Sequence, residues 1–325
     1  MELAEQLRES CVSVEGPGPL HGLTVSVGVT LGTAVRGAEQ TLRDAETALH
    51  QAKGGGRDRC EFFDDDLRSR AERHNTVDRR LRQALDANAV QVHYQPVVDL
   101  ATDTIVGCEA LLRIVGEDGA RFDPVELVAA AEDGGLIRRI EETVLRSAAD
   151  TVGLLSTVAG RPLWVSVNIS DRRLLDSRFP LALARTLHLA GLPAEQLHLE
   201  LHPDTLGRLG PGRRLLHQLR ALGVGTVLDG YTGSGPVDHL TDGAVDLVKL
   251  DRRLVRGLGE PRGRVRAELA VAPLLEHGVG VCAVGVETRP ELDAARSLGC
   301  RYAQGYLYSP PVDAARLRTV LSDLA

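Results

Sequence analysis

The stretch G-T-V-L-D-G-Y-T-G-S-G, residues 225–235, has the pattern of a buried strand that runs into a glycine-rich loop. Its apolar centre has the length of a strand, and Asp229 stands where the strand gives way to the loop. A carboxylate at such a point either ligates a metal ion or caps a turn. The segments on both sides decide between these two roles.

From residue 89 onward, short apolar runs alternate with longer amphipathic ones. Runs such as LWVSVNIS, LHLEL and DLVKLD predict strands, and stretches such as PLALARTLHLAG and RPELDAARSLG predict helices. Strand–helix units repeated over about 235 residues indicate a parallel α/β architecture. Roughly eight units favour a closed (β/α)8 TIM-like barrel over an open doubly wound sheet, and no GxGxxG pattern follows the first strand.

The N-terminal part of the chain has a different pattern. Residues 1–66 predict a few helices and strands of a small α+β segment, which are too few to close a core alone. Residues 67–88 are highly charged with leucines at helical spacing, which is typical of a solvated connecting helix. We therefore expect a small segment at 1–66, a connecting helix at 67–88 and a barrel at 89–325.

Composition limits the classes of partner. With 43% hydrophobic and 26% charged residues the chain is typical of a soluble protein, and its net charge of −7 argues against a nucleic-acid polymer as partner. No apolar run reaches the length of a membrane span and the first residues are polar, so we expect no membrane contact and a cytoplasmic location. The five cysteines form no CxxC pair and are expected to be free thiols.

In a barrel of this kind, chemistry takes place at the carboxyl ends of the strands. Polar residues occur at or just after these ends in the order Glu109, Asn168, Glu200, Asp229, Lys249, Asp251, Glu287 and Gln304. Oxygen donors of this type suit a hard cation such as Mg2+ or Mn2+, with a phosphate as co-ligand. Their occurrence at successive strand ends favours a metal ligand over a turn cap for Asp229.

Lysine is rare in this chain, which draws attention to Lys249. Of 38 basic residues only Lys53 and Lys249 are lysines, which leaves 36 arginines. A chain that otherwise uses arginine is expected to keep a lysine where a compact ammonium group is needed and a planar guanidinium would not serve.

Several motifs then identify a family. They are Y-Q-P-V-V-D-L at 94–100, E-A-L-L-R at 109–113, V-N-I-S at 167–170, L-E-L at 199–201, D-L-V-K-L-D at 246–251, G-V-E-T at 285–288 and Q-G-Y-L-Y-S-P-P at 304–311. In this order and spacing they resemble the EAL domain family over residues 78–325. The resemblance implies an EAL barrel that hydrolyses cyclic di-GMP to linear pGpG with two Mg2+ or Mn2+ ions and an activated water.

The resemblance also implies roles for individual residues. It gives Glu109, Asn168, Glu200 and Asp229 as metal ligands. It gives Lys249 the task of holding the attacking water, with Glu287 as a supporting catalytic residue. The implied contacts to cyclic di-GMP are Gln95, Arg113, Asp251 and Gln304. For Gln95 and Arg113, ordinary hydrogen bonds at the barrel rim remain the alternative.

The first segment resembles a second family. V-S-V-G-V at 25–29 and D-A-E-T-A-L-H-Q-A-K-G-G-G-R-D-R at 44–59 are similar to the last third of a GGDEF (diguanylate cyclase) domain. The GGDEF signature itself does not occur in the sequence. The resemblance therefore implies a GGDEF remnant without cyclase activity.

Two positions depart from the EAL pattern. Aligned on Thr232-Gly233, the family's D-D-F-G-T-G places Leu228 where the first acid would bridge both metals. The family's E-G-V-E-T has Val284 in place of its first glutamate. Without these acids we expect at most one Mg2+ or Mn2+ ion and little or no phosphodiesterase activity.

Three functions stay open at this point. The first is a degenerate EAL domain that acts as a cyclic di-GMP receptor or regulatory module. The second is a weak or active phosphodiesterase that produces pGpG, and the third is a scaffold that binds no nucleotide. A homodimer or a complex with another signalling protein stays open as a further partner.

Overall fold

The computed structural model describes residues 2–12, 24–32, 37–54, 57–87, 89–114, 124–203, 205, 213–233 and 243–323. The chain forms two compact units, Met1–Asn88 with Phe122–Leu136, and Ala89–Arg121 with Ile137–Ala325. The segment Phe122–Leu136 thus groups with the first unit, although it lies between two strands of the second unit in the sequence. No helix in these described ranges has the length and apolarity that a membrane crossing requires.

The first unit is a small α/β assembly. Its elements are α1 (Glu2–Val12), β1 (Val27–Val29), α2 (Ala38–Gly54), β2 (Cys60–Phe62), α3 (Asp65–Asp86) and α4 (Pro124–Asp133). Strands β1 and β2 pair in parallel, and Ala48, Phe63 and Leu67 form a buried cluster. Asp64 starts α3 because its carboxylate accepts the Leu67 amide at 2.6 Å, which satisfies one of the free donors of the first turn.

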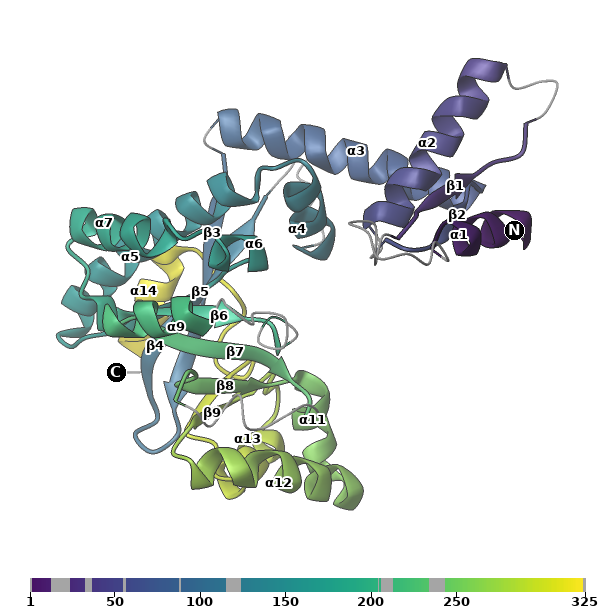
Figure 1. The fold of residues 1–325 in the computed structure, drawn as a ribbon. Helices are drawn as coiled ribbons and strands as arrows, with labels where there is room; N and C mark the ends of the chain where they lie inside the picture. The colour runs from purple at the N-terminus through teal and green to yellow at the C-terminus, as the bar shows by residue number, and fades with distance from the viewer. Residues whose placement is uncertain are drawn as a thin grey trace. The chain divides into compact units, whose positions relative to one another are not determined.

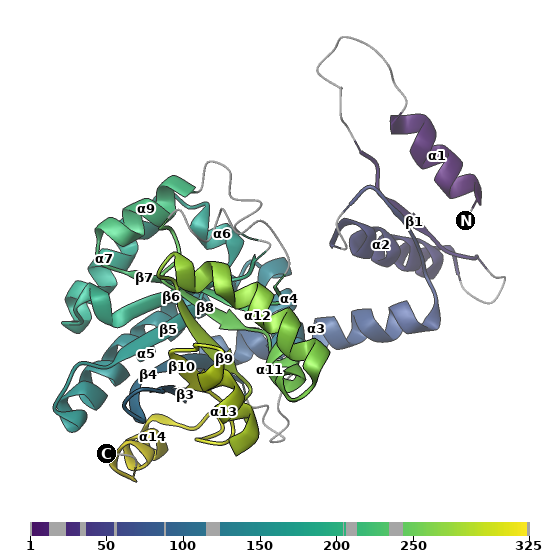
Figure 2. The same cartoon turned by 90° about the horizontal axis from the view of Figure 1, so that it is seen from below.

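The second unit contains a closed barrel of eight strands within the described residues. The strands are β3 (Gln91–Asp99), β4 (Thr104–Arg113), β5 (Trp164–Asn168), β6 (Leu197–Leu201), β7 (Gly225–Tyr231), β8 (Leu247–Leu250), β9 (Gly280–Val284) and β10 (Tyr302–Gln304). Their order around the barrel is β10-β3-β4-β5-β6-β7-β8-β9. The expected α/β barrel is confirmed, and Figures 1 and 2 show its strands.

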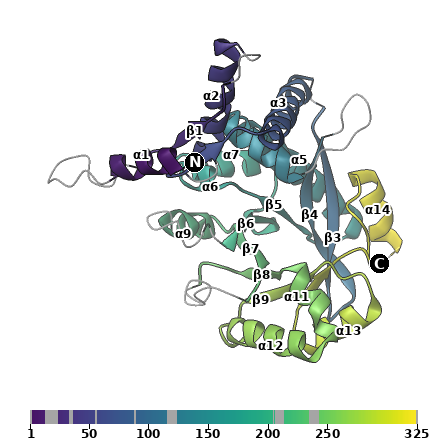
Figure 3. The same ribbon diagram turned by 90° about the vertical axis from the view of Figure 1, so that its right-hand side faces the viewer.

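One strand runs against the others, which corrects the expectation of a fully parallel sheet. Strand β3 pairs antiparallel with both β4 and β10, while the remaining pairs are parallel. The reason is the short connection Leu100–Asp103, because parallel neighbours need a crossover of a dozen residues or more. Figure 3 shows β3 and β4 as two long strands side by side, with α14 next to β3.

Helices cover the outside of the barrel, as Figure 2 shows for α5, α7, α9, α12 and α13. The helical elements of this unit are α5 (Ile137–Ala159), α6 (Asp171–Leu174), α7 (Phe179–Ala190), η1 (Ala194–Gln196), α9 (Arg213–Ala221), α11 (Arg252–Arg256), η3 (Gly257–Gly259), α12 (Pro261–Glu276), α13 (Arg289–Ser297) and α14 (Ala314–Asp323). Each long helix buries an apolar stripe. Helix α5, for example, buries Val144, Ala148 and Leu155 at helical spacing.

Aromatic rings fill the amino end of the barrel, opposite the strand ends that carry the polar residues. Trp164 meets His198 edge to face at a centroid distance of 4.7 Å and Tyr302 at 6.1 Å. A Cβ atom on Gly225 would lie 1.7 Å from His198 Cδ2, and one on Gly107 would lie 2.3 Å from Trp164 Cδ2. Glycine at these two positions therefore gives the rings the space that they occupy.

This packing makes the barrel sensitive to acid through His198. Burial lowers the pKa of His198 to about 4, although the nearby Asp246 carboxylate opposes the shift. Because the folded-state pKa lies below the unfolded value, protonation of the unfolded chain reduces stability as the pH falls from about 6.5 to about 4. We expect His198→Phe to remove about 2 kcal/mol of the stability loss between about pH 7.5 and about pH 5. Urea unfolding of both proteins at the two pH values measures this difference, and equal losses would contradict it.

Candidate functional site

The ammonium group of Lys249 lies at the centre of a buried polar network. Lys249 on β8 is 1% exposed, and its Nζ donates to Glu109 Oε2 on β4 at 2.7 Å and to Glu200 Oε1 on β6. Two buried carboxylates are costly without a cation, and the ammonium between them supplies the opposite charge. The three residues predicted from separate strand ends thus meet inside the barrel.

Amide side chains extend this network. Gln304 Nε2 donates to Glu109 Oε2 at 2.7 Å and to Gln95 Oε1 at 2.9 Å. Gln95 Nε2 donates in turn to the Ser309 carbonyl at 3.1 Å, and Asn168 Nδ2 donates to Glu109 Oε1 at 3.3 Å. The structure therefore joins six of the expected site residues: Gln95, Glu109, Asn168, Glu200, Lys249 and Gln304.

The charges of this cluster depend on one another. Burial raises the pKa of Glu200 to about 8, and the Glu109 carboxylate adds to this effect. Burial acts on Glu109 in the same direction, but Lys249 and the amide donors outweigh it and lower the pKa of Glu109. Burial opposes the charge of Lys249, yet the surrounding carboxylates raise its pKa. Burial thus opposes the charge of Glu200 most strongly, whereas the charge of Glu109 is favoured by its contact with Lys249.

Leu228 does not belong to this site, which corrects its sequence-based placement at a metal-bridging position. On β7 it pairs with Leu201 on β6 and Val248 on β8. The residues next to these two partners, Glu200 and Lys249, bond to each other inside the barrel. Because side chains alternate along a strand, Leu228 points outward toward the helices, where it is 1% exposed.

The inward acid of β7 is Asp229. Between Leu228 and Tyr231 the strand contains a bulge, since this interval pairs with the shorter interval from Val248 to Leu250. Burial raises the pKa of Asp229, and the charge of Lys249 opposes the shift, which places this carboxylate within the influence of the network. Gly230 follows with φ of 76°, a left-handed conformation that glycine adopts freely.

Two further positions complete the inner surface. Val284 on β9 pairs with Gln304, whose amide lies inside the barrel, so Val284 also faces inward. Arg113 lies on the same face of β4 as Glu109, about 13 Å farther toward the carboxyl end. Its Nη1 donates to the Leu112 carbonyl at 2.8 Å. The barrel mouth therefore has an arginine at the rim and an apolar side chain where the resemblance implies a glutamate.

Two expected site residues have other partners. Asp251 caps α11, where it accepts the Arg253 amide at 2.8 Å and Arg253 Nε at 2.9 Å. Glu287 is half exposed, and its Oε1 accepts a hydrogen bond from Arg256 Nη2 at 3.1 Å. Within the described residues, neither carboxylate forms a hydrogen bond or ion pair with Lys249.

The donors present suit one hard cation at most. Glu200 Oε2 is buried and accepts no hydrogen bond from the described residues, and oxygen atoms of Glu109, Asn168 and Asp229 come from adjoining parts of the barrel mouth. Val284 on the inner surface and Gly230 in the bulge of β7 offer no side-chain oxygen. In the described part of the chain no three His, Cys, Asp or Glu side chains are arranged around a metal position, and Lys249 lies between the two glutamates. The oxygen donors of Glu109 and Glu200 are therefore occupied by the ammonium of Lys249 and are not arranged for a pair of ions.

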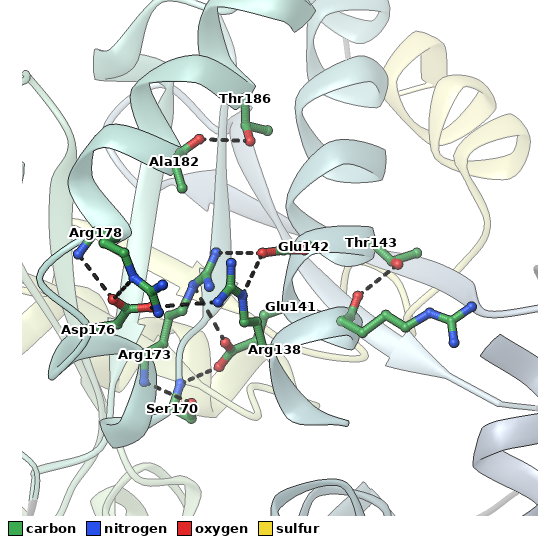
Figure 4. A network of polar contacts seen from close by, with 11 residues as sticks. Arg138, Glu141, Glu142, Thr143, Ser170, Arg173, Asp176, Arg178, Ala182 and Thr186 are labelled. Carbon is green, nitrogen blue, oxygen red and sulfur yellow. Dashed lines mark hydrogen bonds and ion pairs between the residues drawn. The ribbon is translucent and has the colours of Figure 1, made fainter. Parts of the chain in front are cut away.

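Sequence reasoning missed a buried carboxylate near this site. Glu141 on α5 is 4% exposed and accepts the amide of Ser170, two residues beyond Asn168 (Figure 4). A single acid in an amphipathic helix gives no signal of such a role, because it resembles any solvated helix position.

Comparison with known proteins assigns the barrel to a family. The EAL domain model matches residues 78–311. The chain is 32% identical over 303 residues to the cyclic di-GMP phosphodiesterase NbdA of Pseudomonas aeruginosa, an alignment that covers 92% of this chain and 39% of NbdA. The chain thus spans about two fifths of the length of this relative.

Solved structures agree with this assignment. The PaMucR phosphodiesterase in complex with c-di-GMP matches with a TM-score of 0.70 and 28% identity, covering 74% of this chain and 99% of that one. The FimX EAL domain from Pseudomonas aeruginosa bound to c-di-GMP matches with a TM-score of 0.65 and 25% identity, covering 73% and 96%.

The central ammonium provides a test of this arrangement. We expect Lys249→Met to lower the free energy of unfolding by about 3–5 kcal/mol, because two buried carboxylates lose their cation. Adding Glu200→Gln to this variant should recover part of the loss. Lys53→Met is the matched control, because Lys53 is the other lysine of the chain and is exposed. This variant should change stability by less than about 0.5 kcal/mol. Equal effects of the two lysine variants in denaturant unfolding would contradict the role of Lys249.

Proposed function

This chain belongs to the EAL domain family, and we propose that it is a cyclic di-GMP receptor or regulatory module with little or no phosphodiesterase activity. The observation that carries the proposal is the inner surface of the barrel mouth. It retains the network of Lys249, Glu109 and Glu200, but Val284 on the inner face and Gly230 in the β7 bulge offer no oxygen to a second ion. A two-metal hydrolysis needs both ions to clamp the attacking and leaving oxygens.

The retained residues suit a phosphate ligand. Arg113 at the rim offers a guanidinium, the group that binds phosphate in a bidentate manner, and Gln95 offers an amide beside Glu109. We propose that these two side chains contact cyclic di-GMP, with Gln304 in support. The matched structures of PaMucR and FimX contain c-di-GMP, which favours the same ligand class here.

We further propose that one Mg2+ or Mn2+ ion binds weakly through Glu109, Asn168, Glu200 and Asp229. The ion would neutralise these carboxylates and attract a phosphate of the ligand. Asp251 and Glu287 are then supporting residues, since their carboxylates are held by Arg253 and Arg256.

An active phosphodiesterase is the second candidate. It is favoured by the relative NbdA, which is a cyclic di-GMP phosphodiesterase, and by Asp229, which keeps an inward acid on β7. A scaffold that binds no nucleotide is a third candidate. For the rest of the chain we propose a GGDEF remnant at 1–66, a connecting helix at 67–88, a cytoplasmic location, and a homodimer or another signalling protein as partner.

Nucleotide binding is the direct test of the receptor. We expect cyclic di-GMP to bind in calorimetric titrations both with Mg2+ and with EDTA, and Arg113→Ala to weaken binding about tenfold or more, since a hydrogen bond from a charged group is lost. No pGpG should form above the amount seen with Glu109→Ala. Formation of pGpG above that control would favour the enzyme, and no binding under either condition would favour the scaffold.

Acids introduced at Val284 and in the β7 bulge test whether missing ligands limit activity. We expect Gly230→Asp combined with Val284→Glu to raise pGpG formation in the presence of Mn2+ above the wild-type level, because a second ion gains ligands. Gly230 has open space around the position of a Cβ atom, and aspartate tolerates its positive φ better than most residues.

Leu228→Asp is the matched control for this pair. Its carboxylate would lie outside the barrel in an apolar contact, so we expect no gain of activity and a loss of about 3 kcal/mol in stability. A gain of hydrolysis with Leu228→Asp, and none with the pair, would contradict the assignment of inward and outward positions on β7.

A further inference from the structure

The backbone that leaves β5 at Asn168 is anchored on both sides. The amide of Ile169 donates to the Glu200 carbonyl at 3.1 Å, which ties this point to β6. The next amide, that of Ser170, donates to Glu141 Oε1 at 2.7 Å, which ties it to α5. Both anchors lie within two residues of Asn168, so they limit the movement of the strand end.

The carboxylate of Glu141 is itself held in place. Its Oε2 lies 4.0 Å from Arg173 Nε, and the Arg173 side chain is 4% exposed like that of Glu141. The guanidinium also donates to Glu142 Oε1 at 3.2 Å (Figure 4). It lies 4.8 Å from the centre of the Phe179 ring. A buried ion pair of this kind is costly to break, because one partner would remain as an uncompensated charge.

We infer that Glu141 is a positioning residue for Asn168. Asn168 Nδ2 donates to Glu109 Oε1 at 3.3 Å, which fixes the orientation of the carboxamide and therefore of its oxygen. This orientation holds only while the backbone at residues 168–170 stays fixed, and the bond from Ser170 to Glu141 fixes it. The inference rests on the proposed function, since it assigns to Glu141 the orientation of one donor of the single-ion site.

Three variants of the full chain separate positioning from stability. Glu141→Ala removes the acceptor for the Ser170 amide, and Glu141→Gln retains an acceptor of the same length. Glu142→Ala is the matched control. Glu142 shares the Arg173 partner and accepts from Arg138 at 3.0 Å, but the Ser170 amide donates to Glu141 instead. The readouts are the Mn2+ affinity, from the signal of the free ion in electron paramagnetic resonance, and the melting temperature.

We expect Glu141→Ala to weaken Mn2+ binding about tenfold, while Glu141→Gln and Glu142→Ala stay within about threefold of the wild type. The melting temperature should fall for both alanine variants, because each removes a partner of Arg173. Equal Mn2+ affinity of Glu141→Ala and the wild type, or equal losses in the two alanine variants, would overturn the inference. If Glu141→Ala does not fold, Glu141→Asp replaces this variant in the comparison, because the shorter side chain withdraws the carboxylate by one methylene.

A measurement without ligand distinguishes this inference from the proposed function. Hydrogen exchange of the Ser170 amide should become faster in Glu141→Ala and stay slow in Glu141→Gln, and the Asn168 carboxamide signals in NMR spectra should shift only in the first variant. If the wild type binds no Mn2+, the single-ion site is wrong, and these two signals alone decide the role of Glu141. Unchanged exchange and unchanged carboxamide signals in Glu141→Ala would then overturn it.

Discussion

The barrel mouth depends on a balance between one ammonium group and two carboxylates. Glu109 and Glu200 come from strands that are not neighbours, and Lys249 connects them below the solvent-exposed rim. Without a cation, the two acids would repel each other in a region of low dielectric constant. The amides of Gln304 and Asn168 then take their orientation from Glu109, so the positions of the other polar side chains follow from this ion pair.

The two ends of the barrel divide stability and function. At the amino end, the aromatic rings of Trp164, His198 and Tyr302 pack closely together. Trp164 and Tyr302 belong to an apolar layer that lies below the polar network. At the carboxyl end, polar side chains lie at positions that would otherwise carry apolar residues. The free-energy cost of burying these acids and amides is offset by the dense packing beneath them and by the hydrogen bonds that they largely form within the network.

The sequence predicts this arrangement in part. Strand ends could be found because apolar runs stop at polar residues, and the meeting of Glu109, Glu200 and Lys249 follows once the strands form a barrel. The antiparallel β3 could also be found, since Leu100–Asp103 is too short for a crossover, but a count of strand–helix units overlooks it. The direction of the Leu228 side chain could not be predicted. An alignment on Thr232 and Gly233 alone leaves the register of β7 uncertain by one residue, and a shift of one residue moves every side chain to the other face of the strand. Glu141 lies beyond sequence reasoning altogether, since only the fold brings α5 to the end of β5.

The different exposure of the two lysines has a consequence for the chemistry of the whole chain. Lys53 is exposed on α2, whereas Lys249 is enclosed by carboxylates and 1% exposed. Reagents that acylate amines therefore reach the side chain of Lys53 in the folded protein and that of Lys249 only after the barrel opens. Acylation of Lys249 would then report the opening of the barrel mouth in a protein whose other 36 basic side chains, all arginines, do not react.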